Sequence, residues 1–231
     1  MMGMFAQGQK RSASERRAVR NAEVSGDHLA YVERGAGEPV VFVHGAVSDY
    51  RTWSPQLDAL SEQYRTLAYS LRYHYPNKWI GHGGDYSRAL HADDLIAFLR
   101  DLQSGPVHLI GHSYGGALAV SVANTHPELV RSLVLGEPSI FSILTTPEGK
   151  ALLAEHIREF EETLQVFQRG EHERAIKEYL KIVVGLDVFD QLPAVAQVII
   201  RDNIRTLGPM LRTFYVAPMW LRHLVVAMLS R

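Results

Sequence analysis

Cysteine is absent from the 231 residues of this chain, so it holds no disulfide, no thiolate metal site and no cysteine nucleophile. Long apolar runs are absent too: the longest, residues 224–229, is far shorter than the ~20 residues of a membrane-spanning helix. An excess of one charge is also lacking, because 24 Lys and Arg balance 25 Asp and Glu. A net charge of -1 creates no field that attracts nucleic acid or acidic lipid, so the sequence favours a small neutral ligand.

The N-terminal segment, residues 1–22, is basic but has no apolar core of the length found in signal peptides. We therefore expect a cytoplasmic protein with a solvated N-terminal arm. The composition, 46% hydrophobic and 21% charged, is ordinary for a globular protein and suffices for one α/β domain with an insertion.

Residues 23–145 alternate between expected strands and expected helices. The apolar run at residues 39–43 is typical of a strand covered on both faces, and residues 23–33 indicate a hairpin around a Ser-Gly-Asp turn. The sequence therefore predicts parallel βαβ units in a doubly wound, mostly parallel sheet of the α/β class. Further strands are expected at 66–70, 107–110 and 133–135, and helices at 53–64, 86–102 and 115–124.

Residues 146–208 have helical periodicity alone, which is typical of a helical lid that follows the sheet core. The remaining residues, 209–231, form an apolar C-terminal tail of atypical composition. The lid helices are expected at 147–168, 171–184 and 193–207, punctuated by Gly170, Gly185 and Gly208.

The run Gly111-His112-Ser113-Tyr114-Gly115 fits the pattern G-x-S-x-G and stands between an expected strand and an expected helix. A serine in this setting lies on a sharp, strained turn, so the glycines are needed for the neighbouring backbone to come close. The following helix directs its first N–H groups and its positive dipole end at a developing oxyanion. The motif therefore indicates Ser113 as a nucleophile.

A second motif, His44-Gly45-Ala46, ends the buried strand at residues 39–43. A turn here can aim a backbone N–H at the same point as the helix after Ser113, which gives a two-donor oxyanion hole. Together and in this order, the two motifs resemble those of the α/β-hydrolase family. The resemblance covers residues 23–207.

The resemblance implies that the backbone N–H groups of Ala46 and Tyr114 form the oxyanion hole. It implies that His44 is a structural residue that ties loops together, and that neither a cofactor nor a metal is needed. Epoxide hydrolases and haloalkane dehalogenases of this fold use an aspartate nucleophile, so Ser113 favours ester or related acyl chemistry. An ester requires a histidine to deprotonate the serine and a carboxylate to orient that histidine.

The carboxylate is expected at Glu137, directly after the strand at 133–135, where the active-site groups of open α/β sheets collect. In several branches of the family the acid follows this strand. A glutamate that faces water is the alternative interpretation. Asp187 and Asp190 are further candidates, although their positions are also typical of helix starts in the lid.

The histidine is expected at His223, which alone preserves the chain order of serine, acid and histidine. Its alternative interpretation is a packed residue on an apolar terminal helix. Similar hydrolases continue past the lid with two more strands, and the sequence after Val216 does not match them. We therefore expect the C-terminal part of the core to be truncated or replaced.

These residues predict a carboxylesterase that cleaves small neutral or aromatic esters through an acyl-enzyme on Ser113. A hydrolase scaffold that binds a small ligand or a partner without turnover is an alternative of another class. A cofactor-free perhydrolase on the same residues is a third.

A homodimer is also expected. With the last strands missing, the strand at 133–135 would lie at an open edge whose N–H and C=O groups invite another chain. The apolar segment 219–229 must be covered as well. A two-fold dimer buries both features at once.

Overall fold

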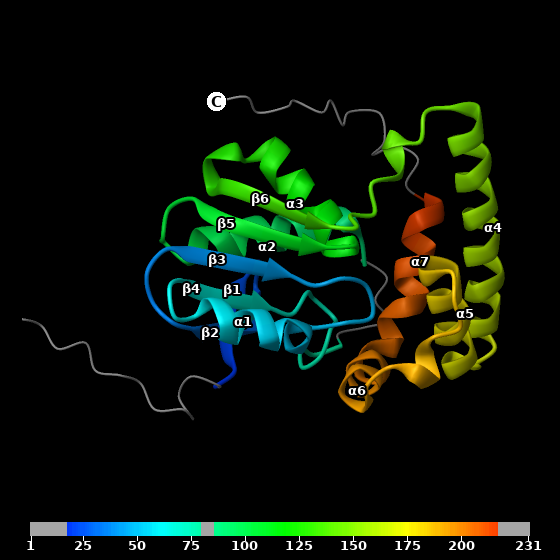
Figure 1. Cartoon of the computed structure of the whole chain (residues 1–231), viewed down its shortest axis with the longest axis horizontal. Helices are drawn as coiled ribbons and strands as arrows, with labels where there is room; N and C mark the ends of the chain where they lie inside the picture. The colour runs from blue at the N-terminus through cyan, green and yellow to red at the C-terminus, as the bar shows by residue number, and fades with distance from the viewer. Residues whose placement is uncertain (1–17, 80–85, 217–231) are drawn as a thin grey trace, which may run out of the picture.

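A six-stranded sheet forms the centre of the computed structural model, which describes residues 18–79 and 86–216 (Figure 1). The order of the strands across the sheet is β1-β2-β4-β3-β5-β6. Strands β3 to β6 are parallel, and β1 and β2 are antiparallel to their neighbours. The strands are β1 (Arg20–Val24), β2 (Asp27–Arg34), β3 (Pro39–Val43), β4 (Arg65–Tyr69), β5 (Val107–His112) and β6 (Val130–Gly136).

The predicted doubly wound, mostly parallel sheet is therefore confirmed, and so is the hairpin at its edge. The hairpin turns at Ser25 and Gly26, which both have positive φ, 50° and 76°. Two such residues in succession match the right-handed twist of the strands that they join.

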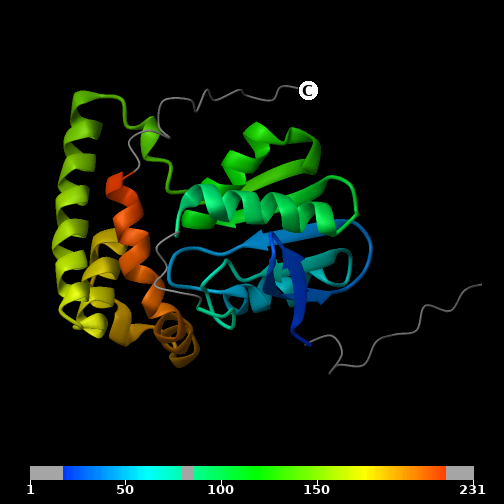
Figure 2. The ribbon, with the colours of Figure 1, turned by 180° about the vertical axis from the view of Figure 1, so that it is seen from behind.

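Helices cover both faces of the sheet, α1 (Ser54–Leu60) on one and α2 (Arg88–Asp101) and α3 (Tyr114–Thr125) on the other (Figures 1 and 2). Because successive side chains of a strand point to opposite faces, β3 serves both layers. Phe42 packs in the layer of α1, whereas Val41 and Val43 pack in the layer of α2 and α3. All five residues of β3 are buried, as the continuous apolar run predicted.

Four further helices stand beyond the carboxyl ends of the parallel strands (Figure 1). We call residues 147–216 the helical block. It consists of α4 (Pro147–Gln168), α5 (His172–Val184), α6 (Ala194–Asn203) and α7 (Leu207–Val216). Short 3-10 turns lie at η2 (Tyr50–Trp53), η3 (Pro127–Leu129), η4 (Phe141–Ile143), η5 (Phe189–Gln191) and η6 (Ile204–Thr206).

The end of the helical block differs from the prediction. The helix expected over 193–207 is divided into α6 and α7 by the turn η6, and the block continues to Val216 instead of ending at 208. Gly208 does not end a helix. It lies inside α7, where an added Cβ would be 2.5 Å from the Phe167 ring, so it is needed for the close packing of α7 on α4.

Strand β6 lies at the edge of the sheet, and its outer side has no neighbouring strand among the residues that the structure describes. Val134 is 54% exposed and Leu135 is 37% exposed, so this edge strand presents apolar side chains at the surface. Within residues 18–79 and 86–216, no helix combines the length and the apolar character needed to cross a bilayer.

Candidate active site

The two sequence motifs meet where the strand order reverses. From β3 the chain passes to β4 on one side, and later to β5 on the other side. In open α/β sheets, ligands bind at such a reversal, outside the carboxyl ends of the strands. The residues that follow β3, beginning with His44, and those that follow β5, beginning with Ser113, therefore share one edge of the sheet.

Ser113 occupies a strained turn between β5 and α3. Its backbone angles, φ 50° and ψ -115°, lie outside the regions that an L-residue readily adopts. Backbone hydrogen bonds hold the turn, because the N–H of Ser113 donates to the Gly136 carbonyl at 2.9 Å. The N–H of Ser139 in turn donates to the Ser113 carbonyl at 3.2 Å. The loop after β6 thus supports the serine, whose side chain is half-exposed.

Glycines allow the backbone to crowd around this turn. A Cβ on Gly115 would lie 2.4 Å from the His44 carbonyl oxygen, and one on Gly111 would lie 2.6 Å from the carbonyl oxygen of Gly115. A Cβ on Gly45 would lie 3.3 Å from the Cβ of Ser113. The loop after β3, which carries Ala46, is therefore packed directly against the serine.

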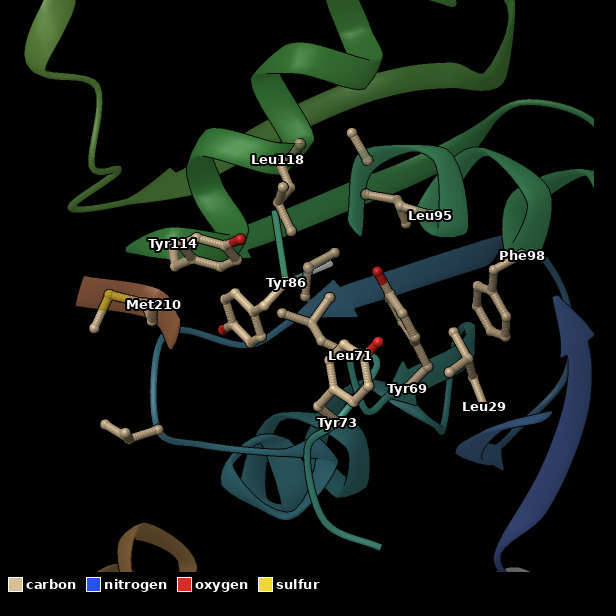
Figure 3. Close-up of a cluster of buried hydrophobic side chains, with 14 of the residues drawn as sticks. Leu29, Tyr69, Leu71, Tyr73, Tyr86, Leu95, Phe98, Tyr114, Leu118 and Met210 are labelled. Atoms are coloured by element: carbon tan, nitrogen blue, oxygen red, sulfur yellow. The ribbon is translucent and has the colours of Figure 1, made fainter. Parts of the chain in front are cut away.

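Tyr114 is the first residue of α3, so its N–H is among those that have no acceptor within the helix. Its side chain points away from the turn into the core, beside Tyr86 and Met210 of α7 (Figure 3). The phenol is 1% exposed and lies 2.9 Å from Nδ1 of His91. Burial raises the pKa of Tyr114, so the phenol is neutral near pH 7 and serves to anchor the start of α3.

His44 is buried and has a fixed tautomer. The Leu71 N–H donates to its Nε2 at 3.0 Å, so the proton is on Nδ1, which donates to the Gly45 carbonyl at 2.8 Å. Burial lowers the pKa of His44 to about 3, with smaller contributions from His91 and His112. A neutral imidazole with both nitrogens occupied joins two loops and is not available as a general base.

His74 and Tyr86 hold the same loop from the other side, and no motif in the sequence marks either residue. His74 Nδ1 donates to the Ser48 carbonyl at 2.7 Å, and its Nε2 lies 3.2 Å from the Tyr86 hydroxyl. Burial, together with the neighbouring His44, lowers the pKa of His74 to about 3. Its hydrogen bonds join residues from separate segments, 26 and 12 positions apart, so the sequence pattern gave no sign of this network.

Glu137 follows β6 directly and has a positive φ of 46°. In the register of β5 and β6, His112 faces Gly136, so Glu137 stands at the same edge as Ser113. Its side chain is exposed. His223, the histidine expected from chain order, lies outside the described residues.

Asp187 and Asp190, the alternative candidates for the acid, lie in the helical block. Asp190 forms an ion pair with Lys177 at 2.8 Å on the surface of the helical block, and Asp187 is exposed nearby. On α4, His156 Nδ1 lies 3.1 Å from the Leu152 carbonyl. The His172 ring stacks on Phe167, with ring centroids 4.4 Å apart. His156 and His172 thus contact residues of the helical block.

Comparison with known proteins places this fold and this turn in a family. The profile described as "Alpha/beta hydrolase family" matches residues 40–229, which include both motifs. The chain belongs to the alpha/beta hydrolase family. The resemblance seen in the sequence is thereby confirmed.

The curated relatives that this chain matches carry the names of several hydrolases. A 2-(acetamidomethylene)succinate hydrolase of Mesorhizobium japonicum is 32% identical over 128 residues, 53% of this chain and 43% of that protein. An esterase of Mycobacterium tuberculosis is 35% identical over 101 residues, 44% of this chain and 33% of that protein. The chain spans about two fifths of the length of the first curated relatives that it matches.

A solved structure extends the similarity of fold into the helical block. An epoxide hydrolase mutant from Bacillus megaterium aligns with 84% of this chain and 70% of its own length, with a TM-score of 0.67 and 22% identity. At this identity the likeness establishes the shared alpha/beta hydrolase fold alone.

Proposed function

We propose that this chain is a serine hydrolase, specifically a carboxylesterase that cleaves small neutral or aromatic esters. The observation that carries the proposal is the strained turn at Ser113, with φ 50° and ψ -115°. The loop that carries Ala46 packs against this turn through Gly45. A half-buried serine on such a turn, at the start of α3 and beside the loop of Ala46, supports acyl transfer, which requires a nucleophile and backbone donors for the oxyanion.

In the proposed reaction, Ser113 Oγ attacks the ester carbonyl carbon while a histidine takes its proton. The N–H groups of Ala46 and Tyr114 donate to the oxyanion of the tetrahedral intermediate. The intermediate collapses, the C–O bond to the alcohol breaks, and the histidine returns its proton to the leaving oxygen. Water then hydrolyses the acyl-enzyme by the same steps. We assign the role of the base to His223. Glu137 is assigned the role of orienting that histidine.

The composition of the helical block supports an apolar substrate, because its helices are rich in Leu, Ile, Val and Phe. Hydrophobic walls with few polar groups are typical of small-molecule sites. The serine also separates this chain from the epoxide hydrolases among its structural relatives, since those of this fold use an aspartate nucleophile.

The test uses p-nitrophenyl acetate and p-nitrophenyl butyrate with wild type and Ser113→Ala. Loss of the nucleophile should lower kcat by roughly three or more orders of magnitude. Ser139→Ala is the matched control, because Ser139 adjoins the turn and its buried Oγ has no hydrogen-bond partner among the described residues. It should retain turnover within a few-fold of wild type.

A fluorophosphonate probe gives an independent readout, because it reacts with an activated serine whatever the natural substrate. It should label wild type and Ser139→Ala and leave Ser113→Ala unlabelled. Equal hydrolysis and equal labelling of wild type and Ser113→Ala would instead favour a binding protein on a hydrolase scaffold.

A further inference from the structure

A buried carboxylate joins the loop of Ala46 to the helical block. Asp49 is 0% exposed and caps the turn η2. Its Oδ1 accepts hydrogen bonds from the Arg51 N–H and from Arg51 Nε, both at 2.9 Å. Its Oδ2 accepts from Arg51 Nη2 and from Asn203 Nδ2, both at 2.7 Å. Each carboxylate oxygen of Asp49 thus accepts two hydrogen bonds.

Asn203, the last residue of α6, connects three parts of the chain through one amide. Besides its bond to Asp49, Nδ2 donates to the Ile199 carbonyl of its own helix at 2.8 Å. Its Oδ1 accepts the N–H of Tyr75, in the segment after β4, at 2.7 Å. The residue is 1% exposed, so these hydrogen bonds are made away from water. There, a polar group left without a hydrogen bond is costly.

Arg51 closes the cluster on its outer side. Its Nη2 also pairs with Asp202 of α6 at 2.7 Å, and its guanidinium lies 3.9 Å from the centroid of the Tyr75 ring. Burial lowers the pKa of Arg51, but the two carboxylates more than offset this effect and raise it. We call Asp49, Arg51, Tyr75, Asp202 and Asn203 the Asp49 junction.

The junction lies close to the proposed oxyanion hole along the chain. Between Ala46 and Asp49 stand only Val47, which has a positive φ of 46°, and Ser48, whose carbonyl is fixed by His74. A segment this short has little freedom to absorb a displacement of Asp49. A shift of the carboxylate would therefore turn the peptide plane that carries the Ala46 N–H.

We propose that Asn203 is a positioning residue for the oxyanion hole. By holding Asp49, α6 fixes the direction of the Ala46 N–H, and the hole is complete only when the helical block is docked on the loop. The inference rests on the proposed function, because it assumes that Ala46 donates to an oxyanion. It adds that a residue of the helical block controls the rate of the chemical step through a hydrogen bond to the core.

A purely structural role predicts something different. If Asn203 only stabilised the fold, its removal would lower the melting temperature and leave the kcat of the folded enzyme unchanged. A misplaced oxyanion donor weakens the transition state while substrate binding is retained, and a displacement of about 1 Å can cost on the order of 100-fold in rate.

The first experiment compares Asn203→Leu with Thr163→Val. Thr163 is 1% exposed in α4 and its hydroxyl donates to the Glu159 carbonyl, so this control removes a buried polar group of the helical block away from the junction. For Asn203→Leu we expect kcat to fall roughly 10- to 100-fold with KM within about two-fold. The affinity for a boronic acid, which forms a tetrahedral adduct, should fall in parallel. Thr163→Val should leave both constants within about two-fold.

A second variant, Asn203→Asp, keeps the inference testable if the leucine variant fails to fold. When protonated, the new carboxyl can donate to Asp49 and accept from Tyr75 as the amide does; when ionised, it repels Asp49. The kcat of Asn203→Asp relative to wild type should therefore rise as the pH falls, and the ratio removes the titration of the base that both enzymes share. Six titratable or charged groups surround the new carboxyl. They are Asp49, which precedes η2, Tyr50 and Arg51 of η2, Asp202 of α6, and His74 and Tyr75, which follow β4.

The outcomes separate the inference from the proposed function. Turnover that Ser113→Ala does not reduce would overturn both. Turnover that depends on Ser113 but changes equally in Asn203→Leu and Thr163→Val, or a pH-independent ratio for Asn203→Asp, would overturn the positioning role alone. A selective fall in kcat with a rising ratio at low pH would establish it.

Discussion

Gly115 makes the closest backbone approach of the candidate site. We predict that Gly115→Ala destabilises the protein by about 3 kcal/mol, because its Cβ would meet the carbonyl oxygens of His44 and Val43 at 2.4 and 2.5 Å. Gly26→Ala is the control, since Gly26 has a positive φ of 76° but open space around its Cβ position, and should cost about 1 kcal/mol. Urea unfolding of both variants measures the difference. Equal midpoints would contradict the close approach.

The buried histidines make stability depend on pH. The pKa values of His44 and His74 are lowered to about 3, whereas an unfolded chain titrates them near 6.5. Between these values the unfolded state binds more protons, so stability is full above about pH 6.5 and falls as the pH decreases toward 3. We predict that His74→Gln reduces the slope of unfolding free energy against pH by about one proton in this window. Urea titrations at pH 7 and pH 4.5 give the slope, and an unchanged slope would show that His74 is protonated in the folded state.

At the scale of elements, the loop after β6 supports the nucleophile and carries the expected acid. We predict that Glu137→Gln lowers kcat roughly 100-fold or more with little change in KM, because the amide cannot stabilise an imidazolium. Asp190→Asn is the control, since that carboxylate is paired with Lys177 on the helical block. Steady-state kinetics on p-nitrophenyl butyrate distinguish the two. If Asp190→Asn is the inactive variant, the helical block supplies the acid.

The elements with a clear period were predictable from the sequence. Apolar runs located β3 and β5, and the 3.6-residue period located α4 over residues 147–168 with the bounds that the structure has. The turn at Ser113 followed from G-x-S-x-G in its strand-to-helix context. These features depend on neighbours within a few residues along the chain, which is the range that a sequence pattern records.

The contacts that hold the site together were not predictable. Asn203 bonds to Asp49 across 154 positions of the chain, and an isolated asparagine in a helix gives no sign of its partner. Gly208 has the appearance of a helix end in the sequence, yet it serves the approach of Phe167 from another helix. In both cases the cause is tertiary packing, which overrides local propensity.

For the whole molecule, we expect self-association, because the described residues place no strand beside the outer edge of β6. We predict that Val134→Lys weakens a homodimer, because a lysine on an edge strand opposes pairing with a second copy. Leu152→Lys is the control, since Leu152 is comparably exposed, 49% against 54% for Val134, but lies on α4. Light scattering across a range of protein concentrations gives the mass. A wild-type chain that stays monomeric throughout would contradict this expectation.

The order of the strands has a consequence for the chain as it leaves the ribosome. Val40 of β3 pairs with Thr66 on one side and with His108 on the other, so β3 is synthesised well before its second neighbour. At about 5 to 20 residues per second, that neighbour follows several seconds later. Throughout this delay the nascent chain carries a fully apolar strand with an unpaired edge. The yield of folded protein in a cell should therefore depend on how β3 is shielded during synthesis, even where the finished fold is stable.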